Sequence, residues 1–184
     1  MVLALALFAA AAGGVLSAGG RRAATRPAPS AKYGGLPSWL PKPKTPINRI
    51  LSASSERPAL ATQGETVSVG LAHGHVLAIG PETPEQGKFP VPATTHCTFV
   101  VTFAAGSGVI PISPSAFTLV DERGHVRHPR VTSMDGAPPP RQVPPGRTIS
   151  LKVHDVIPTG DGALEWTPDG SRPLVAWDFV VEID

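Results

Sequence analysis

Cysteine and recognisable catalytic motifs are scarce in this sequence, and each scarcity excludes a class of protein. The only cysteine is Cys97, so the chain has no internal disulfide and no Cys-x-x-Cys metal or redox pair. No Gly-x-Ser-x-Gly elbow, Gly-x-Gly-x-x-Gly loop or Walker loop is present. The sequence therefore predicts a protein that is not an enzyme and that holds no nucleotide, metal or other cofactor.

Acidic residues are missing from the first 46 residues, where six arginines and lysines lie. The rest of the chain carries ten basic and fourteen acidic side chains, a net charge of about −4. A mildly acidic domain lacks the basic patch that nucleic acids require, so we expect no nucleic-acid partner. Aromatic residues make up only 5% of the 184 residues, so aliphatic side chains have to form most of the core.

The first 20 residues, MVLALALFAAAAGGVLSAGG, contain no charged side chain. Such a run is typical of membrane targeting, and as a helix it is about 28 Å long, barely enough to span a bilayer. Ser17, Ala18 and Gly19 are small residues at which a signal peptidase can cut. A cleaved signal peptide and a retained membrane anchor both fit, and we expect this segment to contact the membrane.

Residues 21–46 form a basic linker with six prolines, which cannot pack a core and should be extended. Its first two residues, Arg21 and Arg22, would by the positive-inside tendency hold the rest of the chain in the cytoplasm. The leader and linker together favour export instead. We therefore predict a domain that faces outside at the cell membrane or is secreted, with the cytoplasmic placement as the alternative.

From residue 47 to residue 184 the apolar residues alternate with polar ones, which predicts half-buried strands. Four runs carry the pattern, and their inward residues are Val67, Val69 and Leu71; Cys97, Phe99, Val101 and Phe103; Ile149, Leu151 and Val153; and Val175, Trp177, Phe179, Val181 and Ile183. Turn sequences such as DERGH (121–125), VPPGR (143–147) and TPDGSRP (167–173) separate the runs. The fold class is all-β, an antiparallel sandwich of two sheets.

Two segments, 81–95 and 132–144, are rich in proline and longer than usual connections between strands. Binding residues concentrate on long loops that a rigid scaffold holds in place. We therefore expect these two loops to carry a binding surface.

The same sequence resembles the small immunoglobulin-like domains of unknown function in bacterial exported proteins, which are related to a secreted immunogenic protein of Gram-positive bacteria. The resemblance covers roughly residues 62–184, with AAGSG standing where the family commonly has Asn-x-Gly. Its matching positions are Gly64, Glu65, Val67, Val69, Phe99 to Phe103, Phe117, Leu119, Asp121, Gly124, Pro145 and Gly146. It implies an immunoglobulin-like fold and an exported, often membrane-tethered, non-enzymatic module with no shared active site.

The stretch GLAHGHVLAIG raises the question of metal binding through His73 and His75. In one continuous strand both imidazoles would point into the core, where unpartnered polar groups are unfavourable. We therefore expect a turn at Ala72–His75, with Gly74 supplying a positive φ and both histidines exposed. Two exposed imidazoles can bind copper, zinc or nickel, but they are too few for a stable site.

Other candidate residues have structural interpretations. Cys97 lies in an apolar alternation and is expected to be a small core residue. Glu82 and Glu85 are spaced like a carboxylate pair but more simply belong to a solvated loop, and Asp178 is expected on the outer face of the last strand. The sequence does not indicate whether the strand ending at Trp166 pairs within a sheet or covers its edge.

Three functions remain open at this point. The preferred one is a non-enzymatic, membrane-tethered or secreted β-sandwich that binds a protein or envelope component. The first alternative is an extracytoplasmic metal-binding protein that uses His73 and His75. The second is a hydrolase with scattered catalytic residues.

The predicted location can be checked by protease treatment of intact cells that express the full chain with a C-terminal tag. We expect the tag to be lost, because the leader exports the domain. N-terminal sequencing of released protein should find a new terminus near Gly19 if the signal is cleaved. A tag that survives on intact cells and is lost only after lysis would mean that Arg21 and Arg22 set the topology.

Overall fold

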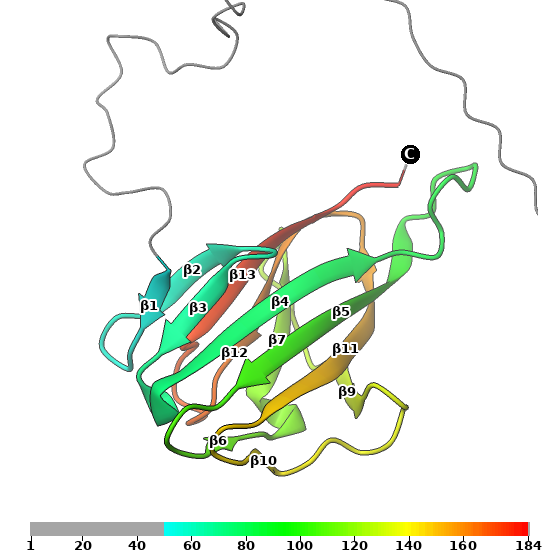
Figure 1. Cartoon of the computed structure of the whole chain (residues 1–184). Coiled ribbons are helices and arrows are strands. Elements are labelled where there is room, and N and C mark those ends of the chain that lie inside the picture. Colours follow the sequence, from blue (N-terminus) through cyan, green and yellow to red (C-terminus); the bar gives the residue numbers. More distant parts are fainter. Residues whose placement is uncertain (1–49, 184) are drawn as a thin grey trace, which may run out of the picture. The chain divides into compact units, whose positions relative to one another are not determined.

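The computed structural model describes residues 50–183 (Figure 1). The expected apolar helix of residues 1–20 and the linker of residues 21–46 lie outside this part. Within the described residues, no helix has the length and hydropathy needed to cross a bilayer. The buried core of the described part is built from residues 53–183, so a fragment of residues 45–184 carries all of it and is expected to fold on its own.

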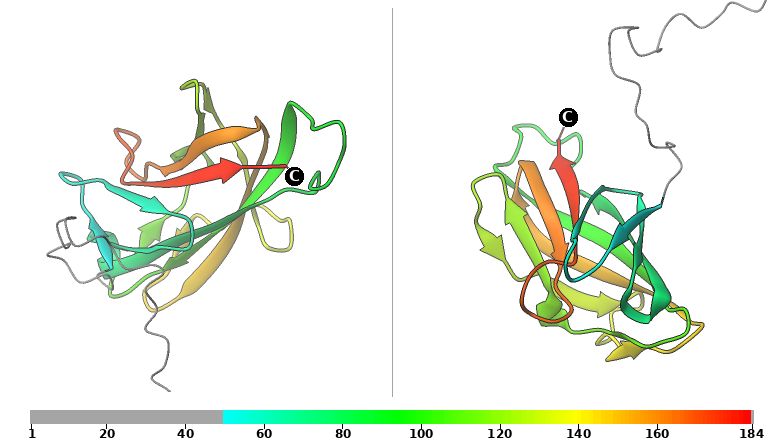
Figure 2. Two further views of the ribbon diagram at one scale, coloured as in Figure 1. Left: turned by 90° about the horizontal axis from the view of Figure 1, so that it is seen from above. Right: turned by 90° about the vertical axis from the view of Figure 1, so that its left-hand side faces the viewer.

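Two sheets face each other as two layers (Figures 1 and 2), which confirms the predicted all-β sandwich. The larger sheet has six strands, in the order β1 (Leu51–Ala53), β3 (Thr66–Val69), β4 (Gly74–Glu82), β5 (Thr94–Ala104), β11 (Thr148–Pro158) and β9 (Arg130–Ser133). The smaller has five, in the order β2 (Ala59–Thr62), β13 (Val175–Val181), β12 (Gly160–Trp166), β7 (Phe117–Asp121) and β8 (Val126–Arg127).

Four short elements complete the described part at the turns. Strands β6 (Ile110–Pro111) and β10 (Gln142–Val143) pair with each other, and the 3-10 helices are η1 (Leu71–His73) and η2 (Pro114–Ala116). Strand β12 pairs on both sides, with β13 and with β7. The strand that ends at Trp166 therefore lies inside a sheet and does not cover an edge.

The prediction that all pairings are antiparallel is wrong at two places. Strand β1 runs parallel to β3, and β2 runs parallel to β13. The chain leaves the larger sheet after Ala53, forms β2 in the smaller sheet, and returns as β3. Such a crossover between two strands of one sheet permits parallel pairing, whereas a tight hairpin enforces antiparallel pairing.

The core consists of the alternating residues that the sequence predicts, with large aromatic side chains joining the two sheets. On β5, Cys97, Phe99, Val101 and Phe103 are fully buried. The ring of Phe99 lies 4.9 Å from that of Phe179 on β13, and the ring of Phe103 lies 5.0 Å from that of Trp166 on β12. Each such pair adds about 0.5–1.5 kcal/mol beyond the area that it buries.

The turn around His73 forms as expected, but by a different backbone route. Positive φ angles occur at Ala72 (58°) and His73 (46°), whereas Gly74 is extended with a φ of −103°. Glycine is needed at position 74 for space, because a Cβ atom there would lie 2.8 Å from the carbonyl oxygen of Ala104. Leu71 was expected on the face of Val67 and Val69, but it leaves the strand and enters η1.

The turn is held against the loop that follows β5. The carbonyl oxygen of Ala72 accepts hydrogen bonds from the amides of Gly106 (3.2 Å) and Gly108 (3.4 Å). A Cβ atom on Gly106 would lie 2.4 Å from the carbonyl oxygen of His73, so only glycine permits this approach. The glycines of the AAGSG sequence (104–108) therefore allow the close approach that supports the strained turn.

Two glycines of this turn should respond to alanine in opposite ways. Gly74→Ala is expected to lower the free energy of unfolding by about 2 kcal/mol, because the new methyl group overpacks against β5. Gly70→Ala is the matched control, since Gly70 has a φ of −60° and a Cβ there would meet its nearest atom, the oxygen of Ala53, at 3.9 Å. It should be neutral or stabilise by up to about 1 kcal/mol.

Urea denaturation of residues 45–184 measures both changes. A Gly74→Ala variant as stable as the wild type would show that β4 and β5 do not approach as closely as described.

Candidate functional site

The two histidines of the sequence motif are exposed but do not belong to a larger group of ligands. His73 ends η1, and His75 lies on β4 between Ser68 of β3 and Ala104 of β5. Among residues 50–183, no three histidine, cysteine, aspartate or glutamate side chains come together in a way that could hold a metal ion. The metal-binding hypothesis therefore rests on two imidazoles, fewer than a zinc site needs.

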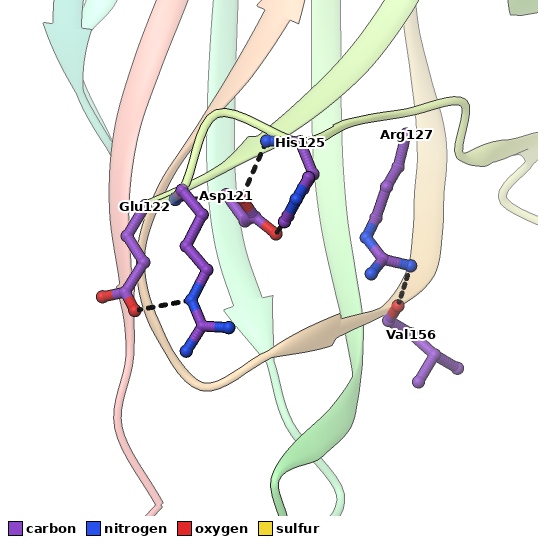
Figure 3. Close-up of polar contacts among 6 residues, drawn as sticks. Asp121, Glu122, His125, Arg127 and Val156 are labelled. Carbon is purple, nitrogen blue, oxygen red and sulfur yellow. Dashed lines mark hydrogen bonds and ion pairs between the residues drawn. The ribbon is translucent and has the colours of Figure 1, made fainter.

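A cluster of charged residues lies at the DERGH turn between β7 and β8 (Figure 3). The Asp121 carboxylate accepts hydrogen bonds from the amides of His125 (2.9 Å) and Arg123 (3.0 Å) and lies 3.1 Å from His125 Nδ1. These bonds, that of the His125 amide above all, hold the pKa of Asp121 below its usual range. The Asp121 carboxylate thus stabilises the turn of the β7–β8 hairpin.

The rest of this cluster also makes structural contacts. Glu122 and Arg123 form an exposed ion pair of 3.9 Å, and Arg127 Nη1 donates to the carbonyl oxygen of Val156 at 3.4 Å (Figure 3). The contact of Arg127 links β8 of the smaller sheet to β11 of the larger one. We therefore interpret the cluster as a brace between the sheets.

Cys97 is buried on β5, as expected of a core residue. Burial, together with the nearby carboxylates of Glu85 and Asp155, raises the pKa of its thiol to about 12. Because the thiolate is the reactive form, the side chain is inert near neutral pH.

Glu85 fastens the long loop of residues 83–93 to the start of β5. One carboxylate oxygen accepts hydrogen bonds from Thr95 Oγ1 and from the amide of His96 (3.3 Å). These bonds, that of Thr95 first, hold the pKa of Glu85 below its usual range. Glu82 is separate, because it lies on β4 and pairs with Thr98. The two glutamates thus have different structural positions.

The loop that Glu85 fastens presents an apolar surface to solvent. We call residues 88–92 (Lys-Phe-Pro-Val-Pro) the apolar tip. Phe89 is 94% exposed and Val91 is 54% exposed. An open hollow of about 470 Å³ lies between the tip and β5, and Phe89 and Glu85 are among its lining residues. The loop of residues 81–95 is therefore exposed and apolar at its tip, and its role in binding stays a prediction.

A more enclosed hollow, which we call the end groove, has a volume of about 360 Å³. Four separate turns of the chain meet there, those after β1, β3, β12 and around β6. Its apolar lining consists of Leu71, Pro111, Pro168, Pro173 and Leu174, and its polar lining of Ser54, Ser55, Asp169 and Arg172. The groove therefore combines apolar walls with a few polar groups of both charges.

Backbone hydrogen bonds tie the turns of the end groove to the sheets. The amide of Gly70 donates to Ala53 (3.1 Å), and that of Leu174 donates to Trp166 (2.8 Å). The Asp169 carboxylate accepts from the amide of Ser171 at 3.0 Å, and this bond holds the pKa of Asp169 below its usual range. Asp169 thus stays charged near neutral pH, and backbone hydrogen bonds restrain two of the turns that line the groove.

Sequence reasoning did not find the end groove. The TPDGSRP segment reads only as a turn, and its meeting with Leu71 and Ser54 depends on the pairing of β1, β3 and β13 across two sheets. The other long segment that the sequence favoured, residues 132–144, does not line the groove. Alternation of apolar residues predicts strands, but it does not predict which turns meet.

Comparison with known proteins yields distant similarities. No family model matches the chain, and no curated protein matches it. The structure is similar to that of MPT63, a secreted protein from Mycobacterium tuberculosis, with 17% identity over 66% of this chain and 98% of that one and a TM-score of 0.46. It is also similar to the Bacillus subtilis protein YcdA, a candidate lipoprotein, with 12% identity over 60% and 37% of the two chains and a TM-score of 0.43.

Both similarities are remote, so ligand, activity and location have to be argued from the residues of this chain. Membership of the immunoglobulin-like domains of exported proteins stays a prediction from the sequence. The β-sandwich itself is established by the two facing sheets of the structure.

The attachment of the loop by Glu85 should depend on pH. In the folded protein the pKa of Glu85 is lowered, so its hydrogen bonds are fully present above the ordinary range of a glutamate and are lost as the pH falls through the lowered value. We expect exchange of the His96 amide proton, corrected for the intrinsic rate, to accelerate at acidic pH. In Glu85→Ala, exchange of the His96 amide proton should be about tenfold faster than in the wild type at every pH above the ordinary pKa range of a glutamate.

Glu82→Ala is the control, because Glu82 is an exposed glutamate on β4. Equal exchange of the His96 amide in the wild type and in Glu85→Ala would show that Glu85 does not hold the loop.

Proposed function

We propose that this protein is a non-enzymatic, immunoglobulin-like module, secreted or tethered to the membrane with its domain outside, that binds an apolar segment of a protein or envelope component in the end groove. The observation that carries the proposal is the groove itself. Its volume of about 360 Å³ and its lining of leucine and proline suit an apolar side chain and its neighbours.

The end groove is suited to binding because its shape is fixed in advance. Leu71 is 37% exposed and lies in η1, where it presents apolar surface to a ligand. The backbone hydrogen bonds of Gly70 and Leu174 restrain the turns on either side. A ligand therefore loses little affinity to ordering of the protein.

The polar groups of the groove favour recognition over catalysis. Asp169 is held as a carboxylate by the amide of Ser171, which makes it a poor proton acceptor near neutral pH. Arg172 lies in the same lining and balances its charge. Ser54 and Ser55 add hydroxyl groups that can orient a peptide backbone. These features support binding of a segment with little net charge.

The export part of the proposal rests on the sequence ahead of the sandwich. The uncharged run of residues 1–20 supports targeting to the membrane, and the proline-rich linker of residues 21–46 supports a spacer that carries the domain away from it.

Binding to the end groove can be measured with residues 45–184 and the fluorescent dye 1-anilinonaphthalene-8-sulfonate, which has apolar aromatic rings and an anionic sulfonate. We expect Leu71→Asp to weaken dye binding by about tenfold, because a carboxylate in the apolar wall would be desolvated by the dye and would repel its sulfonate. Leu60→Asp is the matched control, since Leu60 is 71% exposed on β2 and is not part of the groove lining.

Thermal unfolding of both variants checks that the domain stays folded. Equal dye binding by the wild type and Leu71→Asp would mean that the dye binds elsewhere, and the groove would then not be the binding site proposed.

A further inference from the structure

The apolar tip and the end groove lie at opposite ends of the sandwich. Figure 1 shows the loop between β4 and β5 at one end and the turn between β12 and β13 at the other, and the views of Figure 2 agree. Leu71 of the groove precedes β4, whereas the tip follows it. The nine residues of β4 span about 30 Å at the usual rise of a strand, so the tip cannot reach the groove of its own molecule.

The tip has the properties of a binding element. Phe89 is 94% exposed, and aromatic side chains with such exposure commonly anchor contacts between proteins. Glu85 fixes the base of the loop through Thr95 and His96, so the ring is presented on a restrained support. The tip therefore requires little further ordering to bind a partner.

The end groove matches the tip in size and in polarity. A cavity of about 150 Å³ in a protein core is enough to hold benzene, so the groove of about 360 Å³ has room for the phenyl ring of Phe89 and the neighbouring proline ring. Its walls are leucine and proline, which are suitable partners for an aromatic ring and for a proline-rich backbone. The shapes and polarities of the two surfaces are thus compatible.

The charges beside the two surfaces are also compatible. Lys88 stands next to Phe89 at the tip with its side chain 62% exposed, and its Nζ lies 4.0 Å from Glu85 Oε1 at the base of the loop. Asp169 lines the groove as a carboxylate. The exposed ammonium group at the tip and the carboxylate in the groove carry opposite charges beside the apolar contact, which selects its orientation.

We propose that the end groove of one molecule binds the apolar tip of a second copy of the same chain. The inference rests on the proposed function, because it names the occupant of the same groove. The two surfaces are different and lie at opposite ends, so the contact is heterologous and joins molecules head to tail into rows. A contact made by one loop buries little area, and we expect a dissociation constant of about 0.1–1 mM.

Tethering makes such a weak contact effective. Chains held at one membrane have a high local concentration, which favours a weak contact between neighbours. Many such contacts along a row add to the stability of the row.

The test uses two differently tagged copies of the full chain expressed in the same cells. In copy A, Phe89 is replaced by the photoreactive residue p-benzoylphenylalanine, which keeps an aromatic ring at the tip. Illumination of intact cells should join copy A to copy B, and mass spectrometry should place the link in residues 70–71 or 168–174 of copy B. Leu71→Asp in copy B should reduce the linked product by about tenfold.

The asymmetry of the contact supplies the controls. Leu71→Asp in copy A should leave the product unchanged, because the tip of copy A does not use its own groove. Phe89→Asp or Leu60→Asp in copy B should also leave it unchanged. A loss that is equal whether Leu71→Asp is placed in copy A or in copy B would overturn the head-to-tail contact.

The remaining outcomes separate this inference from the proposed function. No link between the copies, or links only to lipid or to other proteins, overturns self-association while dye binding to the groove can still hold. A link that maps to the groove together with a failure of the dye to bind would support the head-to-tail contact and reject the groove as a general apolar site.

Discussion

The contact between the aromatic rings of facing sheets is the interaction on which the rest of the structure depends. Phe99 and Phe103, four residues apart on β5, contact Phe179 and Trp166 of the smaller sheet. Because these two contacts lie two pleat repeats apart on the same face of β5, they fix both the spacing of the sheets and their relative position along the strands. The relative position of the two sheets determines where the turns at each end lie. The locations of the end groove and the apolar tip therefore depend on it.

The two candidate binding surfaces lie at the two ends of the sandwich, and specific hydrogen bonds restrain the turns that form them. At one end the amides of Gly70 and Leu174 hold the turns of the groove, and at the other Glu85 holds the loop that carries Phe89. The charged cluster at the turn between β7 and β8 makes structural contacts instead, as Asp121 does with the amide of His125. The molecule therefore offers two prepared surfaces on a rigid body, which is an arrangement suited to assembly and recognition.

The strands could be predicted from the sequence because their signal is local. Alternation identified the inward residues of β5 and β13, the exposed Asp178 and the buried Cys97. The failures concern relations between distant segments. The parallel pairing of β1 depends on a crossover through the other sheet, the need for glycine at position 74 depends on the approach of Ala104, and the groove depends on four turns that meet. The periodicity of apolar residues within one segment does not predict contacts between segments that are distant in the sequence.

The crossing of the chain from β1 to β2 also has a mechanical consequence. Any tension applied to the chain ahead of Leu51 is carried first by β1, which pairs with β3 through three residues, and then by β2, which pairs with β13 through four. These short strands yield before the long pairing of β5 with β11. Ser54 and Ser55 lie between them and line the groove, so a pull strong enough to detach β1 would remove one wall of the groove while the rest of the sandwich stayed intact.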